Sequence, residues 1–459
     1  MRRRGISLNG GFADMARCRV SYDNAVNLCN GVNNAWNVNF SNGNVNNNNR
    51  TNTNRVRAVA AFDDLRPFVE SFLEAYEDCL KNKRTSPQAV EYMPTAAEDV
   101  PRLALEVWER RYKPTTSTCF MVTYPKLREV FAAAFRDRIV HHWICKRLTP
   151  LFEARCRQLG DCAHACRVGH GTAFAVKHLK YGIDTVTQNH TREAWIYKGD
   201  IVGFFMHIDR ALLWDMLRRL IVEKYDGQDK ETLLYLTEIV VLHEPQKDCK
   251  VNSKVGLWKH IAPGKSLFFI EPGKGEPIGN LTTQFFAGYY MSFLDEYIRV
   301  LFRGKNYYYT RYVDDFVIVC DDRDFLRRSI KLIDNFTRRE LKLETHMDSV
   351  YFQPASHGVK FVGSIIKGDR IYLSNRTLGR MEHAVRRCLH ECERGLTPLT
   401  ARNWRCTINS YYGFMAGTKT WKFRKRLLAM YTDEFFKVFT VVNNKKVTIK
   451  KQYKYSYDY

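Results

Sequence analysis

Two adjacent carboxylates, Asp314 and Asp315, lie between two runs of aromatic and β-branched residues. The flanking residues 307–312 and 316–319 favour β-strands, so the pattern predicts a hairpin that carries both acids at its turn. Two like charges this close repel each other unless a cation neutralises them, and carboxylate oxygens are ligands that Mg²⁺ prefers. The pair alone fits either a metal site or an ordinary solvated turn, so the presence of a third carboxylate upstream decides between them.

A third acid, Asp200, follows residues 195–197, which favour a strand, and precedes residues 211–222, which favour a helix. Asp209 lies where that helix begins, and its side chain is expected to cap the first turn. Asp200, placed in the strand, is therefore left to bind metal. Together with the acidic pair it predicts a two-metal site, in which one ion activates an attacking hydroxyl and the other stabilises a departing pyrophosphate.

The composition indicates the class of partner. The chain has 459 residues, enough for two or three domains, and a formal net charge of +23 with a sequence pI of about 9.5. A charge of this size favours a polyanionic partner, with nucleic acid as the first candidate, although membrane-surface proteins share it. No window approaches the roughly 18 apolar residues of a membrane-spanning helix, and the basic start is not followed by the apolar core of a signal peptide. We expect a cytoplasmic protein without membrane contact, whose 13 cysteines are reduced thiols.

A cysteine-rich stretch offers a second place for chemistry. The residues in it that could bind a metal ion are Cys156, Cys162, His164 and Cys166. Their spacing fits no standard zinc site, so we favour ordinary reduced thiols over zinc ligands. The next residues, 167–171, form a basic glycine-containing loop of the kind that brings backbone and arginine close to phosphate. Arg167 is therefore the candidate phosphate ligand.

The remaining pattern gives the elements that must position these groups. Residues 1 to about 60 are rich in asparagine, which favours turns over helix, and we expect little independent order there. Residues 277–284 form a glycine turn that leads into a helix reaching Phe293, and such a helix N-terminus can lie beside an anion. Hydrophobic periodicity predicts a strand over 119–122 and helices over 62–80, 100–111, 127–148, 326–343, 378–392 and 409–436.

Three of these stretches, in this order, resemble motifs A, B and C of reverse transcriptases. They are Asp200 with Phe205, the segment Ile-Gly-Asn-Leu-Thr-Thr-Gln at 278–284, and Tyr-Val-Asp-Asp-Phe at 312–316. Residues 361–364 resemble the primer-grip hairpin that follows them, and the similarity covers roughly residues 62 to 440. Within this superfamily the chain is most similar to the reverse transcriptases of diversity-generating retroelements, with Thr283-Gln284 where those proteins usually have Ser-Gln.

The resemblance implies an α+β right-hand polymerase fold with fingers, a mixed α/β palm and a helical thumb. The domains expected from it are an Asn-rich extension (1–60), N-terminal helices and fingers (61–195), a palm (196–370) with a fingers insertion around 225–275, a helical thumb (371–440) and a basic aromatic tail (441–459). The tail would bind RNA or a partner, or fray.

The resemblance also assigns roles to single residues. Asp200, Asp314, Asp315 and the backbone carbonyl of Ile201 would hold two Mg²⁺ ions, and Phe205 would exclude a ribose 2′-hydroxyl, although core packing would also explain its ring. Ile278 stands where many relatives carry a glutamine, and an apolar residue there accompanies error-prone copying opposite adenine. The remaining assignments are a triphosphate contact for Arg167, a nucleotide and template pocket for Gly279 and Gln284, and a primer grip for Phe361, Val362 and Gly363.

One departure from the family concerns the proton donor to pyrophosphate. Related chains tend to carry a lysine where this chain has Ser349, and either His346 or Lys342 would have to replace it. The partners implied by the resemblance are deoxynucleotides, a structured template RNA, the RNA/cDNA duplex and a small basic accessory variability protein.

The Asn-rich extension resembles the variable stretch of the lectin-like proteins that such elements diversify. Asparagine codons are rich in adenine, so we interpret residues 1 to about 60 as a template repeat that is read in frame with the enzyme. Two alternatives remain open: a reverse transcriptase of a phage-defence or other bacterial retroelement, and a non-catalytic RNA-binding scaffold with a degenerate palm.

Overall fold

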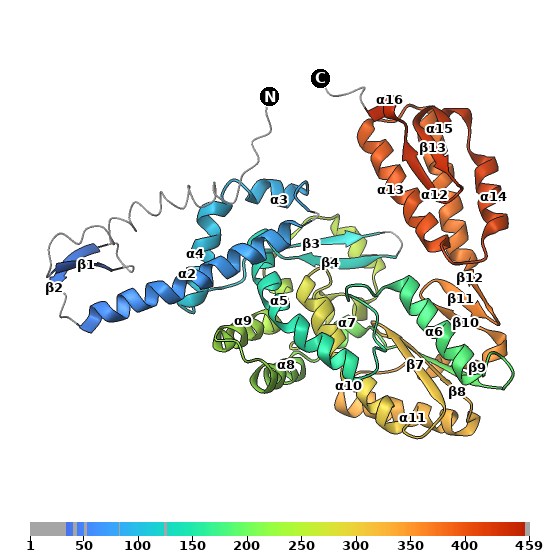
Figure 1. Cartoon of the computed structure of the whole chain (residues 1–459), viewed down its shortest axis with the longest axis horizontal. Coiled ribbons are helices and arrows are strands. Elements are labelled where there is room, and N and C mark those ends of the chain that lie inside the picture. The colour runs from blue at the N-terminus through green and yellow to red at the C-terminus, as the bar shows by residue number, and fades with distance from the viewer. Residues whose placement is uncertain (1–33, 40–43, 50–52, 82, 124–125, 455–459) are drawn as a thin grey trace. The chain divides into compact units, whose positions relative to one another are not determined.

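The computed structural model describes residues 34–39, 44–49, 53–81, 83–123 and 126–454 (Figure 1). The chain divides into two compact units. The first consists of Met1–Arg155 and Phe205–Tyr290, and the second of Cys156–Phe204 and Met291–Tyr459. Helices and strands occur in both, so the prediction of an α+β fold is confirmed.

The first unit is mostly helical. Its helices are α2 (Thr53–Leu80), α3 (Pro87–Tyr92), α4 (Ala96–Trp108), α7 (Phe204–His207), α8 (Arg210–Lys224) and α9 (Lys230–Leu242), together with most of α5 (Phe135–Gln158) and the first half of α10 (Leu281–Leu301). The predicted helices at 62–80 and 100–111 are present, but α2 begins earlier, at Thr53, and α4 is shifted toward the N-terminus. Within the Asn-rich extension, β1 (Asn34–Asn39) pairs with β2 (Asn44–Asn49) in an antiparallel hairpin that the expectation of little order did not include.

A three-stranded sheet in this unit has the order β4-β3-β6, formed by β4 (Arg128–Ala132), β3 (Ser117–Val122) and β6 (Cys249–Val251). The prediction of one helix over 127–148 is wrong, because its first residues form β4 and α5 begins only at Phe135. Burial alternates along β4, as it does in a strand with one covered face, and β4 pairs antiparallel with β3. The sequence pattern missed this change of period within one apolar stretch.

The second unit contains the sheet that carries the acidic residues. Its order is β7-β8-β5-β9, all antiparallel, with β7 (Tyr307–Tyr312), β8 (Asp315–Cys320), β5 (Trp195–Gly199) and β9 (Tyr351–Pro354). The hairpin predicted around the acidic pair is confirmed as β7 and β8. Valines and isoleucines of β5 and β8 are fully buried against α6 (Thr172–Val186), while α11 (Arg323–Glu340) lies near β5.

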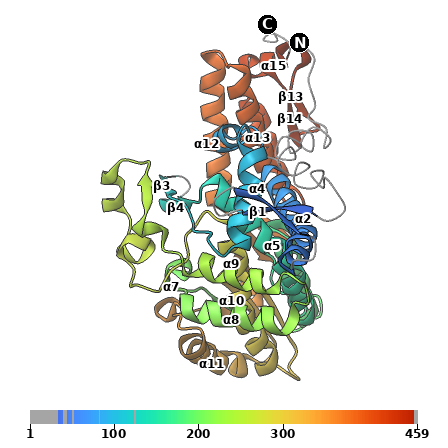
Figure 2. The same ribbon diagram turned by 90° about the vertical axis from the view of Figure 1, so that its left-hand side faces the viewer.

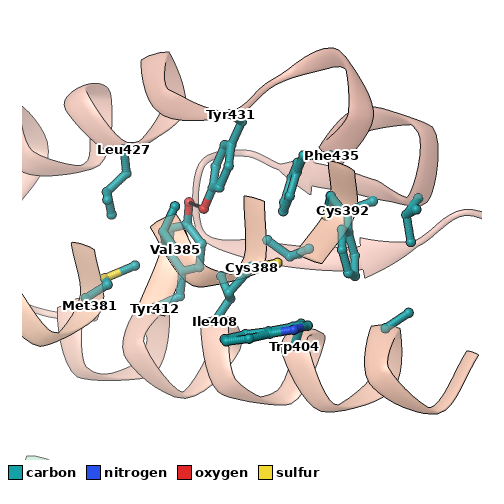
Figure 3. Close-up of a cluster of buried hydrophobic side chains, with 14 of the residues drawn as sticks. Met381, Val385, Cys388, Cys392, Trp404, Ile408, Tyr412, Leu427, Tyr431 and Phe435 are labelled. Carbon is teal, nitrogen blue, oxygen red and sulfur yellow. Dashed lines mark hydrogen bonds between the residues drawn. The ribbon is translucent and has the colours of Figure 1, made fainter. Parts of the chain in front are cut away.

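The predicted thumb region forms a separate hydrophobic cluster in this unit (Figure 3). It contains α12 (Asn375–Glu393), α13 (Pro398–Met415), α14 (Trp421–Met430) and α15 (Asp433–Val438). The prediction of one helix over 409–436 is wrong, because Thr420 and Thr432 begin new helices and Gly417 has a positive φ of 74°. Figure 3 shows Tyr412, Tyr431 and Trp404 among the side chains that fill this cluster.

The last described residues belong to the same cluster. Strand β13 (Phe439–Val442) pairs with β14 (Lys446–Ile449), and α16 (Lys451–Lys454) follows. Val447 and Ile449 are buried in the cluster, so this part of the predicted tail is packed rather than frayed.

Another small sheet of the second unit has the order β10-β11-β12, from Val359–Phe361, Ser364–Lys367 and Arg370–Leu373. None of the helices within the described ranges has both the length and the apolar character needed to cross a membrane.

Candidate active site

The acidic pair lies at a tight, strained hairpin turn. Tyr312 pairs with Asp315, so Val313 and Asp314 are the two loop residues, and Val313 has a φ of 61°. Positive φ at the first loop residue is typical of a type II′ turn, which normally has glycine there. A β-branched residue in this region costs of order 1–3 kcal/mol, so the surrounding structure must hold the turn in place.

Arg311 and Asp295 supply that support. The buried Arg311 guanidinium donates to Asp295 through Nε (2.7 Å) and Nη2 (2.5 Å), and its Nη1 donates to the carbonyl of Val313 (2.8 Å). The Tyr309 hydroxyl also donates to Asp295, at 2.7 Å. The strained turn is thus fastened to α10 by a buried charge pair. Sequence reasoning missed Asp295 as a supporting residue, although a carboxylate within the apolar run of α10 was a visible signal.

Asp200 follows the neighbouring strand. Strand β5 ends at Gly199, one residue earlier than expected, and Gly199 lies opposite Phe316 in the register with β8. The Asp200 carbonyl accepts a hydrogen bond from the His346 amide (3.1 Å), and Ile201 forms an isolated bridge with Thr345. Backbone pairing on both sides therefore fixes the position of Asp200 relative to β8, while its side chain stays exposed.

The electrostatics of this site centre on Asp315. Lys198 Nζ lies 2.9 Å from Asp315 Oδ1, an oxygen that otherwise has no hydrogen-bond partner within the described residues. Burial raises the pKa of the Asp315 carboxyl; Lys198 opposes this increase and the charge of Asp200 adds to it. Asp315 and Asp200 thus repel each other, and Lys198 neutralises them in part.

This arrangement fits a hard cation. The donors are carboxylates, and a buried carboxylate whose pKa is raised partly by another carboxylate gains most from a nearby positive charge. Among the described residues, however, no three His, Cys, Asp or Glu side chains already form a group that could hold a metal ion. To hold a metal ion together, the side chains of Asp200, Asp314 and Asp315 would have to move closer to one another; the Asp200 side chain is exposed.

Two groups were expected to replace the missing lysine, and the structure gives the position of one of them relative to Asp200. His346 Nε2 is 4.0 Å from Asp200 Oδ2, and the imidazole is half exposed. Lys342 has a positive φ of 51° and is exposed. The distance to Asp200 favours His346 as the proton donor, because a donor to the leaving group must lie near the ligands that hold it.

Two of the residues predicted to select the nucleotide lie together in the first unit. Phe205 and Ile278 both pack, half-buried, against a small core that includes Phe131, Met206 and Leu267. The carbonyl of Phe205 accepts a hydrogen bond from the Glu276 amide at 2.7 Å, which ties the phenylalanine segment to the loop before Ile278. The structure thus brings together Phe205 and Ile278, which lie more than seventy positions apart in the sequence.

The loop that carries Ile278 and Gly279 is held closely against β4. The Phe131 amide donates to the carbonyl of Ile278 (2.8 Å), and a Cβ at Gly279 would lie 2.6 Å from the Phe131 carbonyl oxygen. Gly279 also has a φ of 134°, so only glycine fits there without strain. Gln284, on the first turn of α10, is exposed and therefore free of a structural role in the core.

Two buried ionisable side chains close to this loop were not expected from the sequence. Arg210 and Glu276 are almost fully buried, and Arg210 Nε donates to the carbonyl of Gly275 at 2.6 Å. Within the described residues, neither Nη atom of Arg210 nor Oε1 of Glu276 has a hydrogen-bond partner. Burial raises the pKa of Glu276 to about 8, against the opposing charge of Arg210. The bond from Arg210 to Gly275, with the backbone bonds Arg210 to Gly273 and Glu276 to Phe205, joins the 205–210 and 273–276 segments.

Arg167 lies in its own loop rather than at the surface. Its buried guanidinium donates to the carbonyl of Ala163 (2.6 Å) and to Asp161 (2.7 Å). These bonds stabilise the loop, and the triphosphate contact stays a prediction. The neighbouring zinc candidates do not converge either: His164 instead contacts His170 (3.2 Å) and His178 (3.0 Å) through its ring nitrogens.

The predicted primer grip is a tight turn between β10 and β11. Phe361 is fully buried and pairs with Ser364, which leaves Val362 and Gly363 as the loop residues. Both have positive φ, 39° and 89°, the combination found in type I′ turns. The Gly363 carbonyl accepts from the Ser374 amide at 3.2 Å, so the turn is tied to the start of α12.

Comparison with known proteins gives limited similarity. The sequence matches no protein-family model, and the search of curated proteins gives no significant match. Among solved structures, the chain is similar to an apo telomerase from Candida tropicalis, with 10% identity and a TM-score of 0.42 over 71% of this chain and 56% of that one. It is also similar to a telomerase from Candida albicans in complex with a fragment of telomeric RNA, with 11% identity and a TM-score of 0.39 over 71% of this chain and 63% of that one. A form of the Candida tropicalis telomerase truncated from its C-terminal domain has 13% identity and a TM-score of 0.40 over 57% of this chain and 56% of that one. The chain thus spans less than two thirds of the length of these neighbours, and the functional assignment depends on its own site.

Proposed function

We propose that this protein is an RNA-directed DNA polymerase, which extends a primer with deoxynucleotides on an RNA template. One observation carries the proposal: a strained hairpin presents two adjacent carboxylates beside a third acid at the end of the neighbouring strand. Their mutual repulsion creates a demand for cations. The net charge of +23 fits a nucleic-acid substrate.

The residues of the second unit have distinct tasks in this proposal. Asp200, Asp314, Asp315 and the Ile201 carbonyl would hold the cations, and Lys198 would moderate the charge of Asp315 until they bind. Two Mg²⁺ ions, when bound, supply the activation of the primer hydroxyl and the neutralisation of pyrophosphate. His346 would hold the proton that passes to the leaving group.

The residues of the first unit would select the substrate. The ring of Phe205 would exclude the 2′-hydroxyl of a ribonucleotide, and its packing on a rigid core keeps the ring in one position. Ile278 would contact the incoming nucleotide with an apolar surface that makes no hydrogen bond. Gly279 and Gln284 would shape the pocket. Arg167, which belongs to the second unit, would approach the triphosphate.

The test is primer extension on RNA with Mg²⁺ and deoxynucleotides. Asp314→Asn with Asp315→Asn should reduce the rate by at least about 10³-fold, because the cations lose two charged ligands. The matched control is Asp321→Asn with Asp324→Asn, which removes two acids near the other end of β8 and should extend primers at the wild-type rate. An acidic-pair variant that still extends primers would refute the assignment and leave the RNA-binding scaffold.

The biological task that we propose is the copying of a template repeat into cDNA with errors at adenines. The apolar Ile278 and the adenine-rich codons implied by the Asn-rich extension support this task. The accessory variability protein would be a further partner. The extension is mostly outside the described residues, and its interpretation as a translated repeat stays a hypothesis.

Sequencing the cDNA tests this task separately from polymerisation. We expect errors concentrated opposite template adenines, and Ile278→Gln should reduce them by restoring a polar contact to the nucleotide. Active enzyme that copies adenine as accurately as the other bases would instead favour a reverse transcriptase of another retroelement.

A further inference from the structure

A segment of the first unit is ordered without a long helix or strand. Between α9 and the loop of Ile278, residues 247–274 begin at the last residue of a 3₁₀ turn (Pro245–Lys247). They also contain β6 and three further 3₁₀ turns, at Val255–His260, Pro263–Lys265 and Leu267–Phe269. We call these residues the lysine–aromatic segment. Figure 2 shows it in yellow-green beside β3 and β4.

One buried carboxylate organises this segment. Glu129 on β4, only 1% exposed, accepts hydrogen bonds from Trp258 Nε1 (2.6 Å), the Ser266 hydroxyl (2.6 Å) and the Leu267 amide (2.7 Å). Three donors from two 3₁₀ turns and the residue between them thus converge on a single acid. These bonds to a charged acceptor join the segment to β4, in addition to the pairing of β6 with β3 and the backbone bonds of the turns.

The anchor presents aromatic rings to the surface. Phe268 packs against Phe131 (5.6 Å between ring centroids) and Trp258 (6.2 Å), and it is 37% exposed. The next residue, Phe269, is 60% exposed, and Val255 is 76% exposed. Apolar groups this exposed on a fixed support are typical of a binding surface rather than of a folding core.

The same segment carries exposed lysines. The segment has six lysines and two acids, and four of the lysines are exposed and form no ion pair within the described part of the chain: Lys250, Lys254, Lys259 and Lys265. Surface lysines are commonly neutralised by nearby acids, but this segment contains too few acids to do so. The surface therefore offers ammonium groups to an anionic partner.

We propose that the lysine–aromatic segment binds single-stranded nucleic acid. Exposed rings stack on bases whatever their sequence, and unpaired lysines contact the phosphates between them. A double helix buries its base faces and leaves such rings unused, and an acidic peptide supplies charge without flat groups for stacking. This function goes beyond catalysis and needs neither Mg²⁺ nor deoxynucleotides.

The experiment measures binding of a fluorescently labelled single-stranded oligouridylate to the full chain by anisotropy, without Mg²⁺ or nucleotides. Phe269→Ala should weaken binding about tenfold, because it removes one stacking ring. The control is Tyr181→Ala on α6, which removes a ring that is 63% exposed outside the segment and should leave the affinity unchanged.

A triple variant tests the charges. Lys254→Gln, Lys259→Gln and Lys265→Gln together should reduce the slope of log affinity against log salt by about 2, because each phosphate contact on a single strand contributes about 0.7. Lys331→Gln, an exposed lysine on α11, is the matched control. Glu129→Gln should weaken binding while all exposed groups remain, since it releases the anchor; circular dichroism checks that the chain still folds.

Three results would overturn the proposal. Phe269→Ala and the triple variant could bind oligouridylate with wild-type affinity and salt slope. The variants could lose affinity for an RNA duplex as much as for the single strand, which would indicate a duplex surface. They could also lose affinity for polyglutamate equally, which would indicate an unspecific polyanion surface. None of these readings depends on primer extension, so they remain valid if the polymerase assignment fails.

Discussion

The absence of a side chain at Gly199 sets the position of Asp200. A Cβ at Gly199 would lie 2.1 Å from the ring of Phe316, and that ring is fully buried with no space to move. Strand β5 can therefore approach β8 this closely only with glycine at that point. The position of the Asp200 carboxylate relative to Asp315 therefore depends on this close approach of the two strands.

Gly199→Ala should thus move Asp200 away from Asp315, two of the acids that we propose are catalytic. We expect the rate of primer extension to fall at least about tenfold, and the free energy of unfolding to fall by about 1–3 kcal/mol, as overpacked cores do. Gly379→Ala, on α12 with no atom within 4 Å of the added Cβ, should leave both unchanged or slightly raise stability. Wild-type rates in Gly199→Ala would mean that the strand spacing does not control the site.

The buried Asp295–Arg311 pair predicts a second effect. Asp295→Asn leaves the Arg311 charge without its counter-ion, and breaking such a pair costs about 3–5 kcal/mol of unfolding free energy, measurable in urea. Asp295→Leu with Arg311→Met should recover much of that stability, because both polar groups are then gone. The double variant should still extend primers slowly, since the Val313 carbonyl loses its donor. Full activity in a stable double variant would contradict the supporting role of Arg311.

Helices and strands lie where the sequence predicts them when one hydrophobic period continues through the whole element. The acidic hairpin, the helix capped by Asp209, the helix after 281 and the helix after β8 all lie where periodicity and capping residues place them. The pattern failed at 127–148, where a short strand and a helix are joined without a glycine or proline between them. Contacts between distant segments, such as Arg210 with Gly275 and Glu129 with Trp258, are set by tertiary packing, which no local pattern encodes.

The histidine cluster between α6 and the preceding loop predicts a pH dependence. Burial, with the nearby His178, His170 and Arg167, lowers the pKa of His164 to about 3, and burial lowers that of His178 to about 4. Both values lie below the ordinary 6.5, so the folded protein binds fewer protons than the unfolded chain. The free energy of unfolding is therefore highest, as far as these two histidines are concerned, above about pH 6.5, and it decreases as the pH falls toward 4.

Denaturation in urea between pH 7 and 5 measures this dependence. Each buried histidine contributes a slope of up to about 1.4 kcal/mol per pH unit, and His164→Gln should remove one such contribution while keeping a polar group for hydrogen bonding. His383→Gln, a histidine of α12 outside this cluster, serves as the control. An unchanged slope in His164→Gln would show that His164 is protonated in the folded protein.

At the scale of the whole chain, the cluster of residues 373–449 predicts stepwise unfolding. The chain has two compact units, and the described residues of the second include this cluster and another one around β5 and β8. Separate cores need not melt together. We expect a calorimetric enthalpy larger than the van't Hoff enthalpy.

Ile408→Ala locates the step that belongs to the cluster of residues 373–449. Ile408 is fully buried in that cluster, and its truncation should cost about 2–5 kcal/mol. Hydrogen exchange should then become faster in α12 and α13 while β5 and β8 stay protected. Uniformly faster exchange throughout the chain would mean that the clusters unfold as one.

The valine at position 313 has a consequence for engineering. Glycine is the usual residue at that place in a type II′ turn, so Val313→Gly removes a steric cost and adds backbone freedom at the tip that presents Asp314. Selection for thermal stability would therefore favour Val313→Gly, whereas selection for a high catalytic rate would favour keeping valine. At residue 313, a gain in thermal stability is thus expected to lower the catalytic rate.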